Sequence, residues 1–132
     1  MMQEKTKIQH IPVKVYRTVD RLMVAAPMPG LEPEDIVVMV TEEFHLEIQG
    51  DMRGGLKDLK ELLLDEWSVG GYYRKLALPD AVNGEQANVT YGNGVLVIAL
   101  PLSKQMVPAT LRLDKVGIAR GERAGNAGHP PR

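Results

Sequence analysis

The side chains that most often carry catalysis are scattered along this sequence and form no recognised motif. His10, His45 and His129 lie far apart, and no two of them have the spacing that ligates a metal ion. Ser68 and Ser103 both lack the Gly-x-Ser-x-Gly turn that presents a serine nucleophile. The glycine-rich motifs that usually bind phosphate groups are also missing. The sequence therefore predicts no catalytic residue, no metal site and no cofactor.

Two groups of carboxylates remain as candidates for general acid–base chemistry. Glu32, Glu34 and Asp35 form one group, and Glu42 and Glu43 form the other. Each group lies between two apolar runs, where a turn is expected, and turn residues are commonly polar and solvated. We favour that interpretation over paired acid and base catalysis. An enzyme on an all-β scaffold is kept only as an alternative without motif support.

The composition is that of one folded domain. The chain has 132 residues, of which 44% are hydrophobic and 25% charged, and this is too apolar for a disordered chain. Its net charge of -1 speaks against a protein that neutralises nucleic-acid phosphates. It has 0 cysteines, which excludes disulfides and thiolate chemistry, and it has no apolar run long enough to cross a bilayer. We expect a soluble, cytoplasmic domain with neither nucleic acid nor membrane as a partner.

Short apolar runs alternate with Pro and Gly turns over most of the chain, which favours an all-β sandwich or barrel. The dipeptide Asn93-Gly94 predicts a tight hairpin turn, because both residues tolerate positive φ angles. Pro27 and Pro29 are expected to end a strand, because proline donates no backbone hydrogen bond. The strands expected from these patterns are 13–19, 22–26, 36–40, 44–48, 72–78, 87–91, 95–100 and 107–113.

Residues 50–66 differ from the rest because they carry a leucine-rich pattern. Leu56, Leu59 and Leu63 would share one face of a helix, since they are three and four positions apart. A short edge strand across 62–67 fits the pattern equally well. The sequence leaves both structures open.

Five short motifs follow one another along the chain. They are Pro29-Gly30-Leu31 followed by 34–38, Leu46-Glu47-Ile48-Gln49-Gly50, Gly70-x-Tyr72-x-Arg74 with Leu78-Pro79, Asn93-Gly94-Val95-Leu96-Val97 closed by Leu100-Pro101, and Leu111-Arg112-Leu113. In this order they resemble the small heat-shock protein family, also called the Hsp20 or alpha-crystallin domain family, over about 12–101. Each motif is weak alone, but five in register are a specific signal.

The resemblance implies an immunoglobulin-like antiparallel β-sandwich, the alpha-crystallin domain, with a long loop or swap segment and flexible termini. We expect a short N-terminal arm at 1–11, the domain at 12–102, and a C-terminal extension at 103–132 that carries the Leu-x-Leu motif. The last part, 117–132, is rich in Gly, Pro, Arg and Ala and is expected to be disordered. Val89, Leu102 and the short arm depart from the family pattern, and the short arm argues against a large assembly.

The resemblance also implies a homodimer formed by exchange of a loop strand. In bacterial, archaeal and plant members this loop crosses to the neighbouring subunit and pairs with its sheet, and 51–65 has about the right length. The alternative is a local helix folded back onto its own sandwich. The residues expected at the dimer interface are Leu62, Leu64, Glu66, Trp67 and Arg74.

A second implied contact places the tail motif in a groove between the strands at 36–40 and 87–91. Leu111 and Leu113 would dock there weakly and reversibly, with the arginine between them facing water. The alternative is that the two leucines cap the core of their own subunit. The residues expected to line this groove for tail or client are Val38, Val40, Val89 and Tyr91.

Taken together, the resemblance implies an ATP-independent chaperone, a holdase that binds unfolding proteins and prevents their aggregation under heat or other stress. Its partners would be unfolded or misfolded client proteins and a second copy of the chain, with a small higher oligomer as an extension of the dimer. The alternative is an interaction module like the p23/CS co-chaperone domains, which would bind one specific folded partner. The long loop and the tail motif favour the chaperone.

Overall fold

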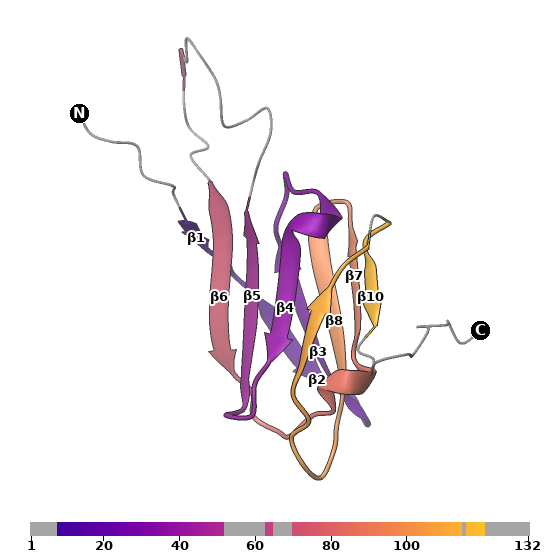
Figure 1. The fold of residues 1–132 in the computed structure, drawn as a ribbon. Helices are drawn as coiled ribbons and strands as arrows, with labels where there is room; N and C mark the ends of the chain where they lie inside the picture. The colour runs from indigo at the N-terminus through magenta and orange to yellow at the C-terminus, as the bar shows by residue number, and fades with distance from the viewer. Residues whose placement is uncertain (1–7, 52–62, 65–69, 115, 121–132) are drawn as a thin grey trace.

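The computed structural model describes residues 8–51, 63–64, 70–114 and 116–120, and these form two stacked β-sheets (Figure 1). The described residues hold β-strands and two short 3-10 helices, η1 (Pro33–Asp35) and η3 (Gly84–Gln86), without an α-helix. The expected all-β sandwich is therefore confirmed. Among these residues no helix has the length and apolar character needed to cross a membrane.

The first sheet, called sheet A, has the strand order β1-β6-β5-β4-β9. Its first pair, β1 (Ile8–His10) and β6 (Gly71–Ala77), is parallel. The following strands, β5 (His45–Asp51), β4 (Ile36–Val40) and β9 (Ala109–Arg112), continue the sheet in antiparallel pairs. An N-terminal strand and a C-terminal strand therefore form the two edges of sheet A.

The second sheet, sheet B, is antiparallel throughout and has the order β10-β7-β8-β3-β2. Its strands are β10 (Ile118–Arg120), β7 (Asn88–Gly92), β8 (Val95–Pro101), β3 (Arg21–Pro27) and β2 (Lys14–Arg17). Here too the edges come from the two ends of the described chain, with β2 at one side and β10 at the other.

Alternating side chains explain how the sheets pack. In β5, the inward residues Leu46 and Ile48 are fully buried, whereas Gln49 and Asp51 are exposed. β3 and β8 follow the same alternation of buried and half-buried positions. The largest fully buried side chains of the resulting core are Ile11, Leu22, Met28, Ile36, Leu46, Ile48, Leu96, Ile98, Leu100, Leu111, Val24 and Val38.

The hairpin between β7 and β8 has the turn that its sequence predicts. Asn93 and Gly94 have φ angles of 54° and 79°, which lie in the left-handed region. A Cβ added to Gly94 would lie 3.3 Å from the Cα of Pro29. The carbonyl of Gly94 accepts a hydrogen bond of 2.8 Å from the N–H of Met28. The hairpin is thereby fastened to the proline-rich turn after β3.

Both chain ends contribute more to the sandwich than the sequence predicts. The arm expected at 1–11 includes β1, and Ile11 has no exposed surface, so the folded domain begins before residue 12. The disorder expected from residue 117 onward is wrong for 118–120, which form β10. In both places a three-residue strand is held by backbone hydrogen bonds to a neighbouring edge, and such pairing leaves little signal in side-chain pattern. Residues 121–132 lie outside the described part.

Candidate functional site

The tail motif lies on the edge of sheet A in the same chain. β9 pairs antiparallel with β4, so that Leu111 stands opposite Val38 and Ala109 stands opposite Val40. Leu111 is 2% exposed and Leu113 is 5% exposed, whereas Arg112 between them is exposed. In this single chain the two leucines belong to the hydrophobic core of the same chain. This is the arrangement of the alternative in which the leucines cap the core of their own subunit.

The segment that follows lies on the edge of sheet B. β10 pairs antiparallel with β7, so that the buried Ala119 stands opposite Val89. The N–H of Tyr91 donates a hydrogen bond of 2.7 Å to the carbonyl of Gly117. The four residues expected to line the groove therefore come from two strands, β4 and β7. The C-terminal segment pairs with both of them, through β9 on β4 and β10 on β7 (Figure 1).

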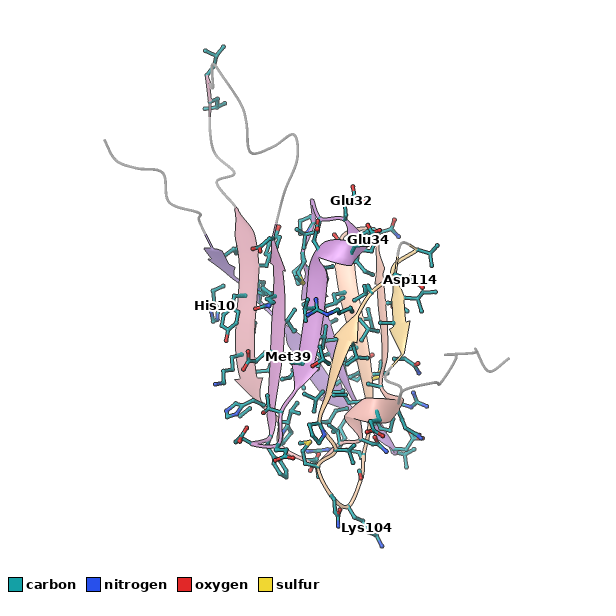
Figure 2. All side chains as sticks on the ribbon, viewed as in Figure 1. His10, Glu32, Glu34, Met39, Lys104 and Asp114 are labelled. Carbon is teal, nitrogen blue, oxygen red and sulfur yellow. The ribbon has the colours of Figure 1, made fainter. Side chains whose placement is uncertain are left out.

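A tight turn joins these two C-terminal strands, and Asp114 organises it (Figure 2). One carboxylate oxygen of Asp114 accepts hydrogen bonds from the N–H groups of Val116, at 3.0 Å, and Ile118, at 3.1 Å. Gly117 has a φ of 87°, and a Cβ at this position would overlap the carbonyl oxygen of Tyr91. The turn therefore needs both the short acidic side chain and the glycine.

The chain between β8 and β9 is fixed to the body of the domain by backbone hydrogen bonds. The N–H of Val107 donates to the carbonyl of Val82 at 2.9 Å, and the N–H of Gly84 donates to the carbonyl of Val107 at 2.7 Å. Ser103 donates its N–H to the carbonyl of Ala81 at 3.0 Å. These contacts hold the start of the tail beside η3.

Two tyrosines fasten the turn after β3 to the rest of the sandwich. The hydroxyl of Tyr91 donates a hydrogen bond of 2.6 Å to the carbonyl of Met28, and that of Tyr72 donates one of 2.8 Å to the carbonyl of Pro29. Burial raises the pKa of the Tyr91 phenol, with a smaller contribution from the charge of Glu32, against a lowering backbone hydrogen bond at Leu31. Tyr91 therefore acts as a neutral donor that connects β7 to the turn after β3.

Replacing Tyr91 by phenylalanine is expected to cost about 1 kcal/mol of stability at neutral pH, because the hydrogen bond to Met28 is lost. Since the native pKa is raised, the stability linked to this phenol is present below about pH 10, the ordinary tyrosine pKa, and is lost as the pH rises beyond it. Urea unfolding from pH 7 to 11 measures both effects. The stability gap between wild type and Tyr91→Phe should narrow above pH 10, and a gap that stays constant would contradict this role. Tyr16→Phe, on an exposed strand, is the control for loss of a hydroxyl.

The residues expected at the dimer interface are only partly described. Leu62, Glu66 and Trp67 lie outside the described residues. Leu64 is 73% exposed. Arg74 is half-buried, and its guanidinium donates a hydrogen bond of 2.6 Å to the carbonyl of Ile11, so that it holds the N-terminal segment in place. No local sequence pattern indicates this contact, because it joins positions 63 residues apart.

One edge strand of the sandwich is fully exposed. All four residues of β2 are exposed, including Val15 and Tyr16, and β2 pairs only on the side of β3 among the described strands. Its other side therefore presents free backbone hydrogen-bonding groups to an incoming strand. Arg17 at its end forms an ion pair of 2.9 Å with Asp80.

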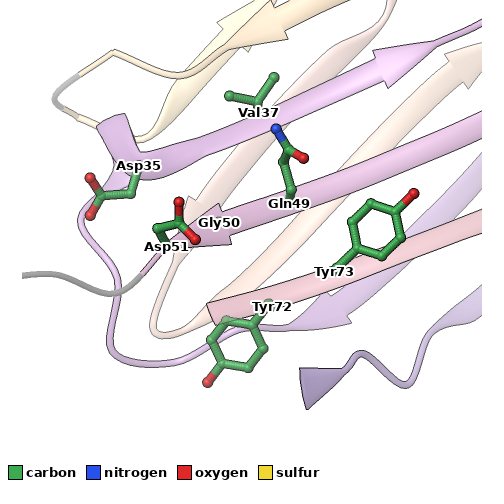
Figure 3. A pocket seen from close by; sticks show the side chains of 7 residues that line it. All are labelled: Asp35, Val37, Gln49, Gly50, Asp51, Tyr72 and Tyr73. Atoms are coloured by element: carbon green, nitrogen blue, oxygen red, sulfur yellow. The ribbon is translucent and has the colours of Figure 1, made fainter. Parts of the chain in front are cut away.

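A shallow pocket of about 270 Å³ opens at the end of sheet A where β5 leads into the loop after Asp51 (Figure 3). Asp35 and Asp51 lie at one end of this pocket and Tyr73 lies at the other. Asp35 also accepts a hydrogen bond of 3.2 Å from the N–H of Glu32, which caps η1. Within the described residues no group of three or more histidines and carboxylates could hold a metal ion. Asp35 therefore has a structural role, because it caps η1.

Most of the chain matches a known protein family. The model of the Hsp20/alpha crystallin family matches residues 14–114. The chain belongs to this family. The resemblance read from the five motifs is thus confirmed, and family membership supports the role of a small heat-shock chaperone.

Individual relatives agree with the family assignment. The "Probable 15 kDa heat shock protein" of Leptospira interrogans is 30% identical over 113 residues, which cover 85% of this chain and 82% of that protein. The "Spore protein SP21" of Stigmatella aurantiaca is 26% identical over 83% of this chain, and the match spans 64% of its own length. The Hsp20 chain thus matches less than two thirds of some longer relatives.

Solved structures share the same sandwich. A small heat-shock protein from Xylella fastidiosa, described as having a distinct high order structure, matches with a TM-score of 0.62 and 26% identity over 81% of this chain and 95% of its own. The hspA protein of Xanthomonas axonopodis matches with a TM-score of 0.62 and 24% identity over 74% of this chain and 97% of its own. The second likeness supports the fold alone.

Proposed function

We propose that this Hsp20 chain is an ATP-independent holdase whose groove between β4 and β7 receives apolar segments of unfolding clients. The observation that carries this proposal is that both groove strands are covered by a short C-terminal segment through two leucines and a few backbone pairs. A client segment in extended form could take the same place, because strand addition needs only backbone hydrogen bonds and apolar side chains.

The energetics of the tail support a reversible contact. Full burial of Leu111 and Leu113 contributes about 1.5–3 kcal/mol for each side chain. Ordering the four residues of β9 costs about 1–2 kcal/mol for each residue. The difference leaves at most about 2 kcal/mol for docking, so the segment would detach often enough for a client to enter.

We also propose that two chains form a homodimer by exchanging the loop strand, which can extend to a small higher oligomer. The exposed outer edge of β2 supports this proposal, because it offers an unpaired strand to a partner. The exposure of Leu63, at 92%, and of Leu64, at 73%, supports it as well, because large apolar side chains of this kind favour burial against a partner. Leu62, Glu66, Trp67 and Arg74 remain the other proposed interface residues.

The p23/CS-like interaction module is the second candidate, but no feature of the described residues favours it over the holdase. An edge closed by a detachable strand suits a binder of many unfolded chains better than a binder of one folded surface. The holdase proposal keeps the expected cytoplasmic location, where heat-labile client proteins are abundant.

Suppression of aggregation tests the proposed function. Two unrelated thermolabile proteins are heated with the purified Hsp20 chain in the absence of nucleotide, and light scattering is followed over time. Because a holdase lowers the concentration of free sticky chains, scattering from both clients should fall in proportion to the chaperone added. Protection of neither client would contradict the proposal and would favour the interaction module, which binds a folded partner instead of unfolding chains. An unrelated β-sandwich domain at equal mass serves as the control.

A further inference from the structure

The outer face of sheet B is apolar at its centre. In β3 and β8 every second residue is buried in the core, so the residues between them point away from it. Near the middle of these strands the outward residues form two cross-strand pairs, Met23 opposite Ala99 and Ala25 opposite Val97. All four are half-buried. These four residues are here called the sheet B patch.

Neighbouring strands extend the patch with further apolar side chains. Tyr16 on β2 stands opposite Met23 and is 50% exposed, and Val95 at the start of β8 is 39% exposed. On the other side of the sheet, Ile118 of β10 is half-buried in the same cross-strand row as Val97. Contiguous apolar surface of this kind on a soluble protein commonly marks a binding surface.

The charged side chains beside the patch are cations. Lys14 stands opposite Ala25, and Arg21 precedes Met23 by two positions on β3. In the described part of the chain Lys14 forms no ion pair, and Arg21 has a contact of 3.6 Å with the carboxylate of Asp20 in the adjoining turn. No outward position of the described strands of sheet B holds a carboxylate. The face therefore favours a partner that brings negative charge to this rim.

The outer face of sheet A has a different character. Glu47 of β5 and Lys75 of β6 stand opposite one another, with their charged atoms 4.0 Å apart. Arg112 of β9 stands opposite Val37 of β4 on the same face. Charges of both signs thus occur on the outer face of sheet A, and this face serves as an internal control for the properties of sheet B.

The strands under the patch have partners on both sides. β3 pairs with β2 and β8, and β8 pairs with β3 and β7, so their backbone groups are used within the sheet. A segment laid on the patch cannot extend the sheet and must satisfy its own backbone hydrogen bonds, which a helix does and a single strand does not. The methyl side chains of Ala25 and Ala99 let a helix approach the sheet closely. The patch therefore fits a helix, whereas the sheet edges fit a strand.

Two other occupants fit this face less well. A second copy packed face to face would bring Lys14 and Arg21 of both chains into one interface, where the described strands of sheet B supply no carboxylate. Lipid-binding surfaces carry clusters of about four to eight cations, whereas the rim beside the patch has Lys14 and Arg21. An acidic amphipathic helix matches both the apolar centre and the cationic rim.

We propose that the outer face of sheet B is a docking site for an amphipathic helix of a partner protein. The apolar stripe of the helix packs on the sheet B patch, and carboxylates flanking the stripe face Lys14 and Arg21. This site is separate from the groove of the proposed function, because the groove residue Val89 points into the core on the opposite side of sheet B. The proposal does not depend on the holdase function.

Binding of synthetic helices to the full Hsp20 chain tests the proposal. One fluorescent peptide carries leucines at i, i+3, i+4 and i+7 with flanking glutamates, and its twin carries lysines in place of the glutamates. At low ionic strength the acidic helix should bind at least about tenfold more tightly than the basic twin, and added salt should reduce this difference. Equal binding of the two helices, or binding of neither, would overturn the proposal. Binding to phosphatidylserine vesicles without binding to the acidic helix would overturn it in favour of a lipid surface.

Substitutions of matched valines locate the binding. Val97→Asn should weaken binding of the acidic helix at least about fivefold, because it places an amide in the apolar centre. Val37→Asn is the matched control, since Val37 is a half-buried outward valine of sheet A. Val97→Thr keeps the branched shape of the side chain and should weaken binding less. Circular dichroism establishes that each variant is folded. Equal binding by folded Val97→Asn and Val37→Asn would overturn the location.

Charge reversal tests the cationic rim. Lys14→Glu/Arg21→Glu should make the basic helix the tighter ligand, whereas Lys75→Glu/Arg112→Glu makes the same change in net charge on sheet A and should keep the preference for the acidic helix. An unchanged preference in the first variant, or reversal in both variants, would overturn the role of Lys14 and Arg21. These measurements use no unfolding client, so they are independent of whether the chain suppresses aggregation.

Discussion

Alanine at both Leu111 and Leu113 is expected to move most chains into an open state with the groove between β4 and β7 exposed. In a fixed site, each Leu→Ala change costs about 2–5 kcal/mol, which together exceeds the few kcal/mol that hold the tail. Under native conditions, the double alanine variant should therefore bind an apolar dye such as anilinonaphthalene sulfonate several-fold more strongly than wild type. The amides of Ala109 to Arg112 should lose their protection from hydrogen exchange.

Val116→Ala is the matched control for this variant, because Val116 belongs to the same segment but is 72% exposed. It should leave dye binding unchanged. The double alanine variant should also protect clients at lower temperature than wild type, since its groove is already open. Dye binding and exchange equal to wild type would contradict the view that the two leucines hold the tail in the groove.

Deletion of residues 57–64 is expected to convert the proposed dimer into monomers. The deletion removes the exposed Leu63 and Leu64 together with the chain that would reach the partner's β2 edge. Light scattering coupled to gel filtration should then give half the mass of the wild-type protein. The loss should be complete at micromolar concentration, because no exchanged loop strand would remain to pair with the partner's β2 edge.

A second variant separates loop length from side-chain contact in this experiment. Leu63→Ser/Leu64→Ser keeps the loop at full length and should weaken the dimer without abolishing it, because backbone pairing remains. An unchanged dimer mass in the deletion variant would refute strand exchange and would favour a loop folded back on its own subunit.

The parts of the fold that the sequence predicts are those specified by side chains. The alternation in β5 and the Asn93-Gly94 turn both follow from local chemistry, and both are found in the structure. β1 and β10 could not be predicted, because each is a three-residue strand held by backbone bonds to an edge that is distant in sequence. Ile11 is likewise buried in the core, and Arg74, 63 residues along the chain, donates a hydrogen bond to the carbonyl of Ile11.

The residues expected to line the groove show the same difference between features that depend on side chains and features that depend on backbone bonds. Val38, Val40 and Val89 are buried beside the C-terminal strands, as expected for apolar residues on inward positions of two strands. In this chain β9 follows a segment that backbone bonds anchor at Val107 to Val82 and Gly84, and such bonds have no side-chain signature. Sequence pattern therefore predicts that these residues are buried, but it does not predict which segment lies beside them.

Site-resolved hydrogen exchange of the Hsp20 chain with and without a heated client tests the central claim most directly. The account predicts that client capture removes protection from the amides of β9 and β10, while β4 and β7 stay protected because client segments replace β9 and β10. If clients stay soluble and bound while β9 and β10 keep their protection, the groove between β4 and β7 is not the client site, and the account is contradicted.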